Sequence, residues 1–592
     1  MRVIAILCML GAAMWGGLQP ALAQTGGLKP APHDDVAAAR AVFEQNIAAI
    51  RNRDREAYLA LYLNSDKLVR IGPTGFATGY EEFAKGAGGA WPDTIEATDM
   101  RLTPLRPGMV YGTYRYRVRY GADEHSGISE RIFVETPQGW KIALTGAIDT
   151  PPGTPPTPRA ITNVTLIDGR GGAPVSNATI VIRDGKIECA GTCSVPEGVN
   201  VVDGRGMFAT PGLVDAHVHF SQTGWADGRP DALDVRATHP YEKTIAGLRA
   251  HPEVFAKSYL CSGVTGVFDV GGYMWTTELA RRFTNDTAAP HVAAAGPLLS
   301  TLDHWLNLPA ERQFIHLKDE ASARDGVSYL AAHGSRAVKV WYINDNAAAI
   351  NAAGAAAAQA GLPLIVHATE LAGAKAAVRA GAKLLVHSVW DVPVDDEFIA
   401  LLKERGTILT PTLTVAGGYV RMFEKKTAID DPNRCVDDAT RAKIASIHSI
   451  DIKADVAARA ERTRQRETLA AANLKRLVAA GIPIATGTDA GNPLTLHGPS
   501  IYAEMEAMQS AGMTPMQVIV ASTATAARAA RFDDVTGTIE KGKSADLLLL
   551  GGDPSKDVRH FRELRVVVRG GVMRGVDELS AMARNPQPSP QP

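Results

Sequence analysis

Short apolar segments that alternate with alanine-rich segments constrain the fold of this chain more than any other feature. Near-continuous apolar segments of this kind are typical of strands buried on both faces of a parallel sheet. The segments are residues 213–217, 264–270, 290–295, 337–341, 363–367, 383–387, 407–410 and 483–486. Eight such strands separated by helices predict an α/β fold of the (β/α)8 TIM-barrel type, in which the helices cover the outside of the barrel.

The first predicted strand ends in two histidines, within the stretch Pro-Gly-Leu-Val-Asp-Ala-His-Val-His at residues 211–219. The i, i+2 spacing of His217 and His219 points both imidazoles to the same side of a strand. Neutral imidazole is a preferred ligand of zinc and neighbouring transition metals. The pair therefore indicates half of a metal site, although two half-buried histidines at a strand end give the same pattern.

Other ionisable residues fall on later strands or at their ends, where barrel enzymes carry their catalytic groups. They are Lys339 on the fourth strand, His367 and His387 at the ends of the fifth and sixth, and Asp489 in Gly-Thr-Asp-Ala-Gly after the eighth. Each has an ordinary alternative: a strand-end histidine, a lysine whose amine reaches out of the barrel, or an aspartate that caps a helix. Taken together, the residues favour a metal centre over these separate explanations.

The composition is that of an ordinary globular protein, and it argues against several classes of binding protein. The 592 residues are 45% hydrophobic and 21% charged, which is enough for large cores. The formal net charge is −1, whereas a nucleic-acid or anionic-membrane binder has a basic footprint. We expect a small-molecule substrate as the partner, with no nucleic acid and no membrane anchor, and the sequence leaves a homo-oligomer open.

Residues 1–23 have the pattern of a secretory signal peptide. Arg2 gives the positive start, residues 3–15 the apolar core, and the small residues at 21–23 the cleavage site. The apolar run is too short for a transmembrane helix, which needs about 20 residues. We therefore expect a cleaved signal peptide and a periplasmic or secreted protein.

The mature chain is predicted to contain several parts. Helical spacing over residues 34–63 and alternating strands at 114–120, 129–135 and 140–145 predict an α+β cone over residues 30–149. The remaining predicted parts are a proline-rich linker (150–158), a small β-sandwich (159–209 and 536–575), the barrel (210–535) and a disordered tail (576–592).

The four cysteines that follow the signal peptide lack the spacing of a cysteine zinc site. Cys189 and Cys193 are close enough in sequence to form a disulfide in an oxidising compartment, but two free thiols fit equally well. Cys261 and Cys435 are expected to be buried or loop thiols.

Residues 160–570 resemble the amidohydrolase superfamily, in particular its imidazolonepropionase/prolidase-like branch of metal-dependent hydrolases. The stretches at 211–219 and 487–491 resemble that family's first-strand and eighth-strand motifs, and residues 537–547 resemble its return to the small β-sandwich. Separately, residues 30–148 resemble the nuclear-transport-factor-2-like (polyketide-cyclase-like) domains in their order of helices and strands.

The first resemblance implies a centre of divalent metal, expected to be two zinc ions. The residues in ligand positions are His217, His219, His367, His387 and Asp489. Lys339 lies where members with two metals carry a carboxylated lysine that bridges both ions, whereas other members hold one metal. A metal lowers the pKa of bound water toward about 7 and polarises the scissile carbonyl. Asp489 is then expected to accept the proton of the water and to pass it to the leaving nitrogen.

The expected activity is hydrolysis of a C–N bond in a small linear substrate, and the resemblance supplies the substrate class, a dipeptide or an N-acyl amino acid. A hydrolase of a cyclic amide, lactone or ester on the same site is the alternative. An inactive barrel that serves as a binding protein is an alternative of another class. His497, Tyr273 and Trp275 lie in loops after predicted strands and are candidates for contact with substrate, although packing roles fit them as well.

Overall fold

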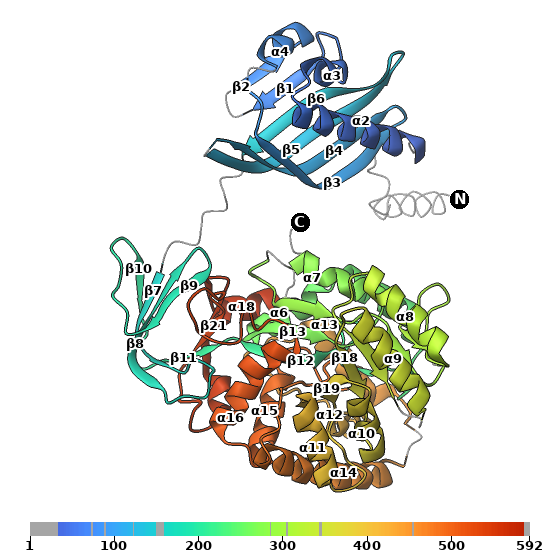
Figure 1. The fold of residues 1–592 in the computed structure, drawn as a ribbon, viewed down its shortest axis with the longest axis vertical. Helices are drawn as coiled ribbons and strands as arrows, with labels where there is room; N and C mark the ends of the chain where they lie inside the picture. The colour runs from blue at the N-terminus through green and yellow to red at the C-terminus, as the bar shows by residue number, and fades with distance from the viewer. Residues whose placement is uncertain are drawn as a thin grey trace, which may run out of the picture. The chain divides into compact units, whose positions relative to one another are not determined.

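The computed structural model describes residues 33–72, 75–87, 90–121, 123–149, 159–283, 286–303, 306–342, 346–452 and 455–584. The chain divides into two compact units, Met1–Thr154 and Pro155–Pro592, and each is described by itself (Figure 1). The predicted signal peptide and the predicted linker lie outside the described residues. Among the described helices, none combines the length and the apolar content needed to cross a membrane.

The N-terminal unit is built on one six-stranded sheet with the strand order β2-β1-β6-β5-β4-β3. Strands β1 and β6 pair in parallel, and the other neighbours pair antiparallel. The strands are β1 (Val69–Gly72), β2 (Gly75–Thr78), β3 (Thr94–Arg106), β4 (Met109–Tyr120), β5 (Asp123–Thr136) and β6 (Gly139–Asp149). The helices are α2 (His33–Asn52), α3 (Arg55–Ala60) and α4 (Tyr80–Gly86).

The stretch with helical spacing, residues 34–63, forms two helices, α2 and α3. Helix α2 ends at Asn52, and Arg53 turns the chain with a φ of 56°. The carboxylate of Asp54 then accepts a hydrogen bond from the backbone N–H of Ala57 and begins α3. The apolar spacing continues across this break, so it could not reveal the turn. Helix α2 packs against the sheet, mainly against β3 (Figure 1).

The C-terminal unit contains one eight-stranded sheet that joins two distant parts of the chain. Its order is β23-β22-β21-β11-β7-β8-β9, and β10 pairs with β7. Antiparallel pairing of β11 with β21 links the two parts. The strands are β7 (Arg159–Leu166), β8 (Val175–Arg183), β9 (Lys186–Gly191), β10 (Asn200–Asp203), β11 (Phe208–Pro211), β21 (Leu547–Leu550), β22 (Leu564–Arg569) and β23 (Val572–Gly575).

The remaining strands of this unit pair in parallel in two runs, β12-β13-β14 and β16-β15-β17-β18-β19-β20. They are β12 (Leu213–Val218), β13 (Val264–Asp269), β14 (His291–Ala294), β15 (Leu298–Ser300), β16 (Phe314–His316), β17 (Val338–Trp341), β18 (Leu364–His367), β19 (Ala382–Val386) and β20 (Ile408–Thr410). Every residue of β12 and β13 is buried, as expected for strands covered on both faces.

The predicted eighth strand at 483–486 forms only an isolated parallel bridge, from Ile484 to Leu409 in β20. Beyond this segment, Ala490 forms an isolated parallel bridge to Val218 in β12. The short strands β15 and β16 were not predicted, because three residues carry too little pattern. Among the described residues the strand pairing does not form a closed ring, so the described fold is a mixed α/β fold with parallel strands.

Alanine-rich helices cover these strands (Figure 1). Small side chains let them approach closely, since a Cβ added to Gly354 in α9 would lie 2.0 Å from the carbonyl oxygen of Ala380. The helices are α5 (Tyr241–Ala250), α6 (Glu253–Cys261), α7 (Glu278–Phe283), α8 (Glu320–Ala332), α9 (Ala347–Gln359), α10 (Leu371–Arg379), α11 (Asp396–Arg405), α12 (Val415–Phe423), α13 (Asp438–Ala445), α14 (Val456–Ala479), α15 (Ser500–Ser510), α16 (Pro515–Val520), α17 (Ala526–Ala529) and α18 (Val576–Arg584).

The prediction of disorder from residue 576 onward is wrong for the stretch that forms α18. Leu579 and Ala583 lie on one face of this helix and are buried. The hydroxyl of Ser580 donates a hydrogen bond to the carbonyl oxygen of Arg434. The proline-rich composition that suggested disorder begins only after the helix, and residues 585–592 lie outside the described part of the chain.

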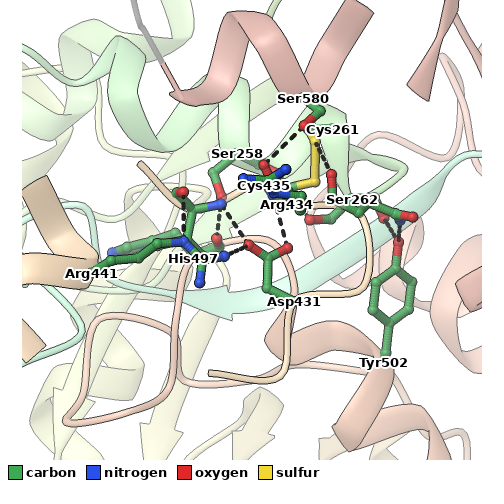
Figure 2. The surroundings of a disulfide bond; sticks show 12 residues. Ser258, Cys261, Ser262, Asp431, Arg434, Cys435, Arg441, His497, Tyr502 and Ser580 are labelled. Carbon is green, nitrogen blue, oxygen red and sulfur yellow. Dashed lines mark hydrogen bonds and ion pairs between the residues drawn. A yellow bond between two sulfur atoms is a disulfide. The ribbon is translucent and has the colours of Figure 1, made fainter. Parts of the chain in front are cut away.

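Two disulfides join the four cysteines, Cys189 with Cys193 and Cys261 with Cys435. The prediction that the second pair are thiols is wrong, because the fold brings together residues 174 positions apart in sequence. Figure 2 shows this disulfide beside Asp431, whose carboxylate accepts a hydrogen bond from the backbone N–H of Cys435. The bond ties the end of α6 to the loop before α13.

Removal of the long-range disulfide is expected to destabilise the C-terminal unit more than removal of the short-range one. A cross-link that closes a 174-residue separation restricts the unfolded chain far more than one that closes 4 residues. Loop-closure entropy gives about 5 kcal/mol for the first and about 2 kcal/mol for the second. Denaturant unfolding of the two double cysteine-to-serine variants measures the difference. Equal losses of stability would contradict this account of the long-range disulfide.

Candidate metal centre

Three histidines and one aspartate come together in the C-terminal unit. The Nε2 atoms of His217 and His219 are 3.3 Å apart. The Oδ1 atom of Asp489 lies 3.3 Å from Nε2 of His217 and 3.0 Å from Nε2 of His219. The Nε2 atom of His387 lies 3.9 Å from Oδ2 of Asp489. All four residues are buried, with at most 7% of their surface exposed.

The backbone around the cluster holds two residues in an unusual conformation. His387 and Asp489 have φ values of 76° and 62°, a region that residues other than glycine adopt rarely. The backbone N–H of Asp489 donates to the carbonyl oxygen of His217, and that of His387 donates to Thr410. These bonds aim both side chains at the end of β12.

Hydrogen bonds on the far side of the imidazole rings fix their orientation. Nδ1 of His219 lies 2.6 Å from the carbonyl oxygen of Gly271, and Nδ1 of His387 lies 2.6 Å from Oγ1 of Thr412. A carbonyl only accepts, so Nδ1 of His219 carries the hydrogen and its Nε2 presents a lone pair to the cluster. This is the usual support of a metal-binding histidine.

Two buried carboxylates hold the segments that carry these ligands. Asp215 accepts hydrogen bonds from the backbone N–H and the hydroxyl of Thr488, at 3.0 and 2.6 Å, and so fixes the residue before Asp489. Asp269 accepts from the backbone N–H groups of Phe220 and Gly271. Burial raises the pKa of Asp215 to about 7 and that of Asp269 to about 6.

The protonation states of the cluster suit a cation. Burial lowers the pKa of His217 well below its usual value and that of His387 to about 4, so both rings are neutral. Burial alone raises the pKa of Asp489, but the neighbouring histidines outweigh this and hold it well below its usual range. Neutral imidazoles and an ionised carboxylate are the forms that bind a metal ion.

The cluster fits a divalent metal in geometry as well as in chemistry. Ligand atoms about 2.1 Å from one tetrahedral ion lie about 3.4 Å apart, close to the separations of 3.0–3.3 Å among His217, His219 and Asp489. Within the described part of the chain, Oδ1 of Asp489 is buried without a hydrogen-bond donor. The ligand atoms of His217, His387 and Asp489 all lie within 4.8 Å of one another. Nitrogen and carboxylate ligands are typical of zinc.

His367 and Lys339 extend the cluster. The ring centroids of His367 and His387 are 4.4 Å apart, and those of His387 and His217 are 5.0 Å apart. Lys339 is buried, and burial lowers its pKa to about 7. The six residues singled out in the sequence as ligands all line one cavity of about 320 Å³.

The cavity also contains residues that the sequence reasoning missed. Arg229 lies in it, but its guanidinium is already paired with the carboxylate of Asp231. Arg459 and Arg466 line the cavity from α14 and form no ion pair among the described residues. Their guanidiniums instead face the rings of Phe423 and Trp390, at 4.3 and 5.7 Å from the centroids. The i, i+7 spacing of these arginines predicts that they share one face of a helix, but it does not indicate that this face lines the cavity.

The predicted substrate contacts His497, Tyr273 and Trp275 are not among the side chains that line the cavity, so this prediction is corrected. All three are buried in the core. His497 stacks on Phe255 at 3.7 Å, and its ring nitrogens lie 2.8 Å from the hydroxyl of Tyr259 and 2.9 Å from a backbone carbonyl. These side chains therefore have packing roles in the described structure.

The substitution Asp269→Asn is expected to weaken metal binding by about 10–100-fold, as loss of a ligand's supporting partner usually does. The two carboxylate oxygens accept one backbone N–H each, and an amide would set an N–H group against one of these donors. Gly271 would then shift and release the ring of His219. Titration of the chelator-treated variant with Zn²⁺ measures the change, and unaltered affinity would contradict this supporting role.

Comparison with known proteins agrees with this architecture. A family model described as "Amidohydrolase family" matches residues 208–575. Among curated proteins, the chain is 26% identical to the ochratoxinase of Aspergillus niger over 467 residues, which covers 71% of this chain and 88% of that protein. It is 27% identical to an imidazolonepropionase of Anaeromyxobacter dehalogenans (strain 2CP-1 / ATCC BAA-258) over 396 residues, which covers 63% and 83%.

Solved structures show the same fold. A Xaa-Pro dipeptidase with bound methionine in its active site matches with a TM-score of 0.55 and 24% identity, covering 71% of this chain and all of that chain. The A. niger ochratoxinase structure matches with a TM-score of 0.56 and 23% identity, covering 73% and 99%.

Proposed function

We propose that this chain, which belongs to the amidohydrolase family, hydrolyses the amide bond of a small linear substrate with a free carboxylate, such as a dipeptide or an N-acyl amino acid. It is a hydrolase that acts on C–N bonds. One observation carries the narrower proposal: the cluster of His217, His219, His387 and Asp489 shares its cavity with arginines that lack an ion-pair partner among the described residues.

Each residue that lines the cavity has its own role in the proposed hydrolysis. A bound divalent metal, which we propose to be zinc, supplies Lewis acidity and an acidified water. Asp489 is ionised, so it accepts the proton of the attacking water and then passes it to the leaving nitrogen. His217, His219, His367 and His387 would hold the metal, and Lys339, carboxylated, would join two ions.

The cavity walls suit the proposed substrate class. Arg459 and Arg466 extend from α14, and each is held against an aromatic ring, so a carboxylate can approach the open edge of the guanidinium. Trp341, Trp390 and Tyr419 give the cavity apolar walls. Such walls favour a substrate with a bulky apolar side chain next to the scissile amide.

The proposed function is tested with pairs of N-acyl amino acids and their C-terminal amides as substrates of the zinc-loaded protein. We expect the free acids to be hydrolysed with at least about tenfold higher kcat/KM, the value of one charge-assisted hydrogen bond. Arg459→Met should raise KM for the acids and leave the amides unchanged. Equal rates for acids and amides would contradict the carboxylate preference, and no hydrolysis of any amide would contradict the function.

We also propose that the protein is exported. The signal-like sequence at residues 1–23 supports this, and so do the two disulfides, which persist in oxidising compartments. Fractionation of the native host followed by N-terminal sequencing tests it, and a mature protein that begins near Gln24 is the expected result.

A further inference from the structure

The N-terminal unit contains a cavity of its own, about 640 Å³ in volume, which plays no part in the proposed hydrolysis. Its lining is strongly aromatic and includes the side chains of Tyr58, Phe83, Trp91, Tyr114 and Tyr116. A volume of several hundred cubic ångströms lined by aromatic side chains and polar groups is typical of a small-molecule site.

Two arginines line this cavity: Arg70 is exposed, whereas Arg131 of β5 is only 5% exposed. The guanidinium of Arg131 donates hydrogen bonds to the hydroxyls of Tyr114, at 2.9 Å, and Ser129, at 2.6 Å, and to a backbone carbonyl oxygen. Its Nε–H has no acceptor, and no carboxylate pairs with it among the described residues. Glu82, the acidic residue of the lining, pairs with Lys85 instead.

A buried cation without a counter-ion is costly, and proteins normally pair it. The neutral oxygens around Arg131 satisfy part of its hydrogen-bonding capacity but supply no negative charge. Burial raises the pKa of Tyr58, on the same wall, well above its usual value, so this hydroxyl is neutral too. The charge that the site lacks is therefore a negative one.

Three large apolar side chains lie at the exposed edge of the cavity. Phe76, Ile71 and Tyr120 belong to the lining, and they are 79%, 46% and 40% exposed. Large apolar side chains gathered at the entrance of a cavity are typical of sites that bind apolar ligands. The apolar side chains at the edge and the buried arginine together favour a ligand with an apolar body and an anionic end.

We propose that the N-terminal unit binds a small aromatic carboxylate, with the ring among the aromatic side chains and the carboxylate on the guanidinium of Arg131. Arginine suits this role because its planar fork matches the two oxygens of a carboxylate. The proposal rests on the N-terminal unit alone and holds whether or not the C-terminal unit has the substrate proposed above.

Calorimetric titration of the full-length protein with 1-naphthoate and with 1-naphthamide tests the proposal, because the two probes differ only in charge at the polar end. We expect the acid to bind at least tenfold more tightly than the amide. Arg131→Met should remove this preference, and Arg131→Lys should reduce it. Arg106→Met, which removes an exposed arginine of the same unit, should keep it.

Two outcomes would overturn the proposal. The first is equal affinity of the wild-type protein for acid and amide, a result that does not depend on whether any variant folds. The second is loss of the preference in Arg459→Met, which would place the bound acid in the cavity of the C-terminal unit. Circular dichroism of Arg131→Met, compared with that of Arg131→Lys, shows whether a loss of binding reflects charge or unfolding.

Discussion

The substitution Asp489→Asn is expected to lower kcat by about 10³–10⁴-fold. General acid–base catalysis by a positioned carboxylate contributes up to about 10⁴-fold, and this residue also faces three imidazoles as the anionic member of the cluster. Asparagine has the same shape but accepts no proton, so the loss should fall on kcat rather than on KM. Steady-state kinetics of the zinc-loaded variant gives kcat and KM separately.

A matched control separates this effect from a general loss of charge. Asp234 is an exposed aspartate that pairs with Arg236, and Asp234→Asn should leave the kinetics unchanged. If Asp489→Asn retained more than about a tenth of the wild-type kcat, well above what loss of acid–base catalysis allows, the proton-transfer role would be wrong. Metal analysis of the variant shows whether the lost activity reflects lost metal.

The substitution Lys339→Met is expected to lower the metal content from about two ions to about one per chain, with a loss of activity of about 10–100-fold. Lys339 is buried in the cavity with the histidines, and methionine fills its space without providing a ligand. Mass spectrometry of the metal content, together with the rate of hydrolysis, tests both parts of this prediction. The control Lys383→Met removes an exposed lysine of the neighbouring strand β19.

Retention of both the metal content and the full rate in Lys339→Met would contradict the bridging role of this lysine. A protein that holds one ion before the substitution, and one ion after it, would place the chain with the family members that use a single metal. In that case the histidine and aspartate ligands would still account for the hydrolysis.

The candidate ligands could be predicted from the sequence because each one lies on or just after a short segment with a clear apolar pattern. The period of two puts His217 and His219 on one side of β12, and parallel strands end at one edge. Residues at the ends of different strands can therefore be expected to meet without any knowledge of the loops. Local periodicity thus predicts both the parallel strands and the candidate ligands.

Features that depend on distant contacts could not be read in the same way. Arg459 and Arg466 reach the cavity only because α14 folds back over it, and nothing in their own helix indicates this. The pairing of Cys261 with Cys435 depends on the whole arrangement of helices between them. Arg131 appears in the sequence as one more charged residue of an alternating strand, and only the fold reveals that it is buried without a counter-ion.

The most direct test of the metal centre is one titration. The full-length protein is stripped with a chelator, its metal content is measured, and hydrolysis of an N-acyl amino acid is followed as Zn²⁺ is added back. We predict no activity in the stripped protein and a rate that rises with bound metal, while a His217→Ala/His219→Ala variant stays inactive at every concentration. Full activity in protein that retains no metal above background would contradict the account.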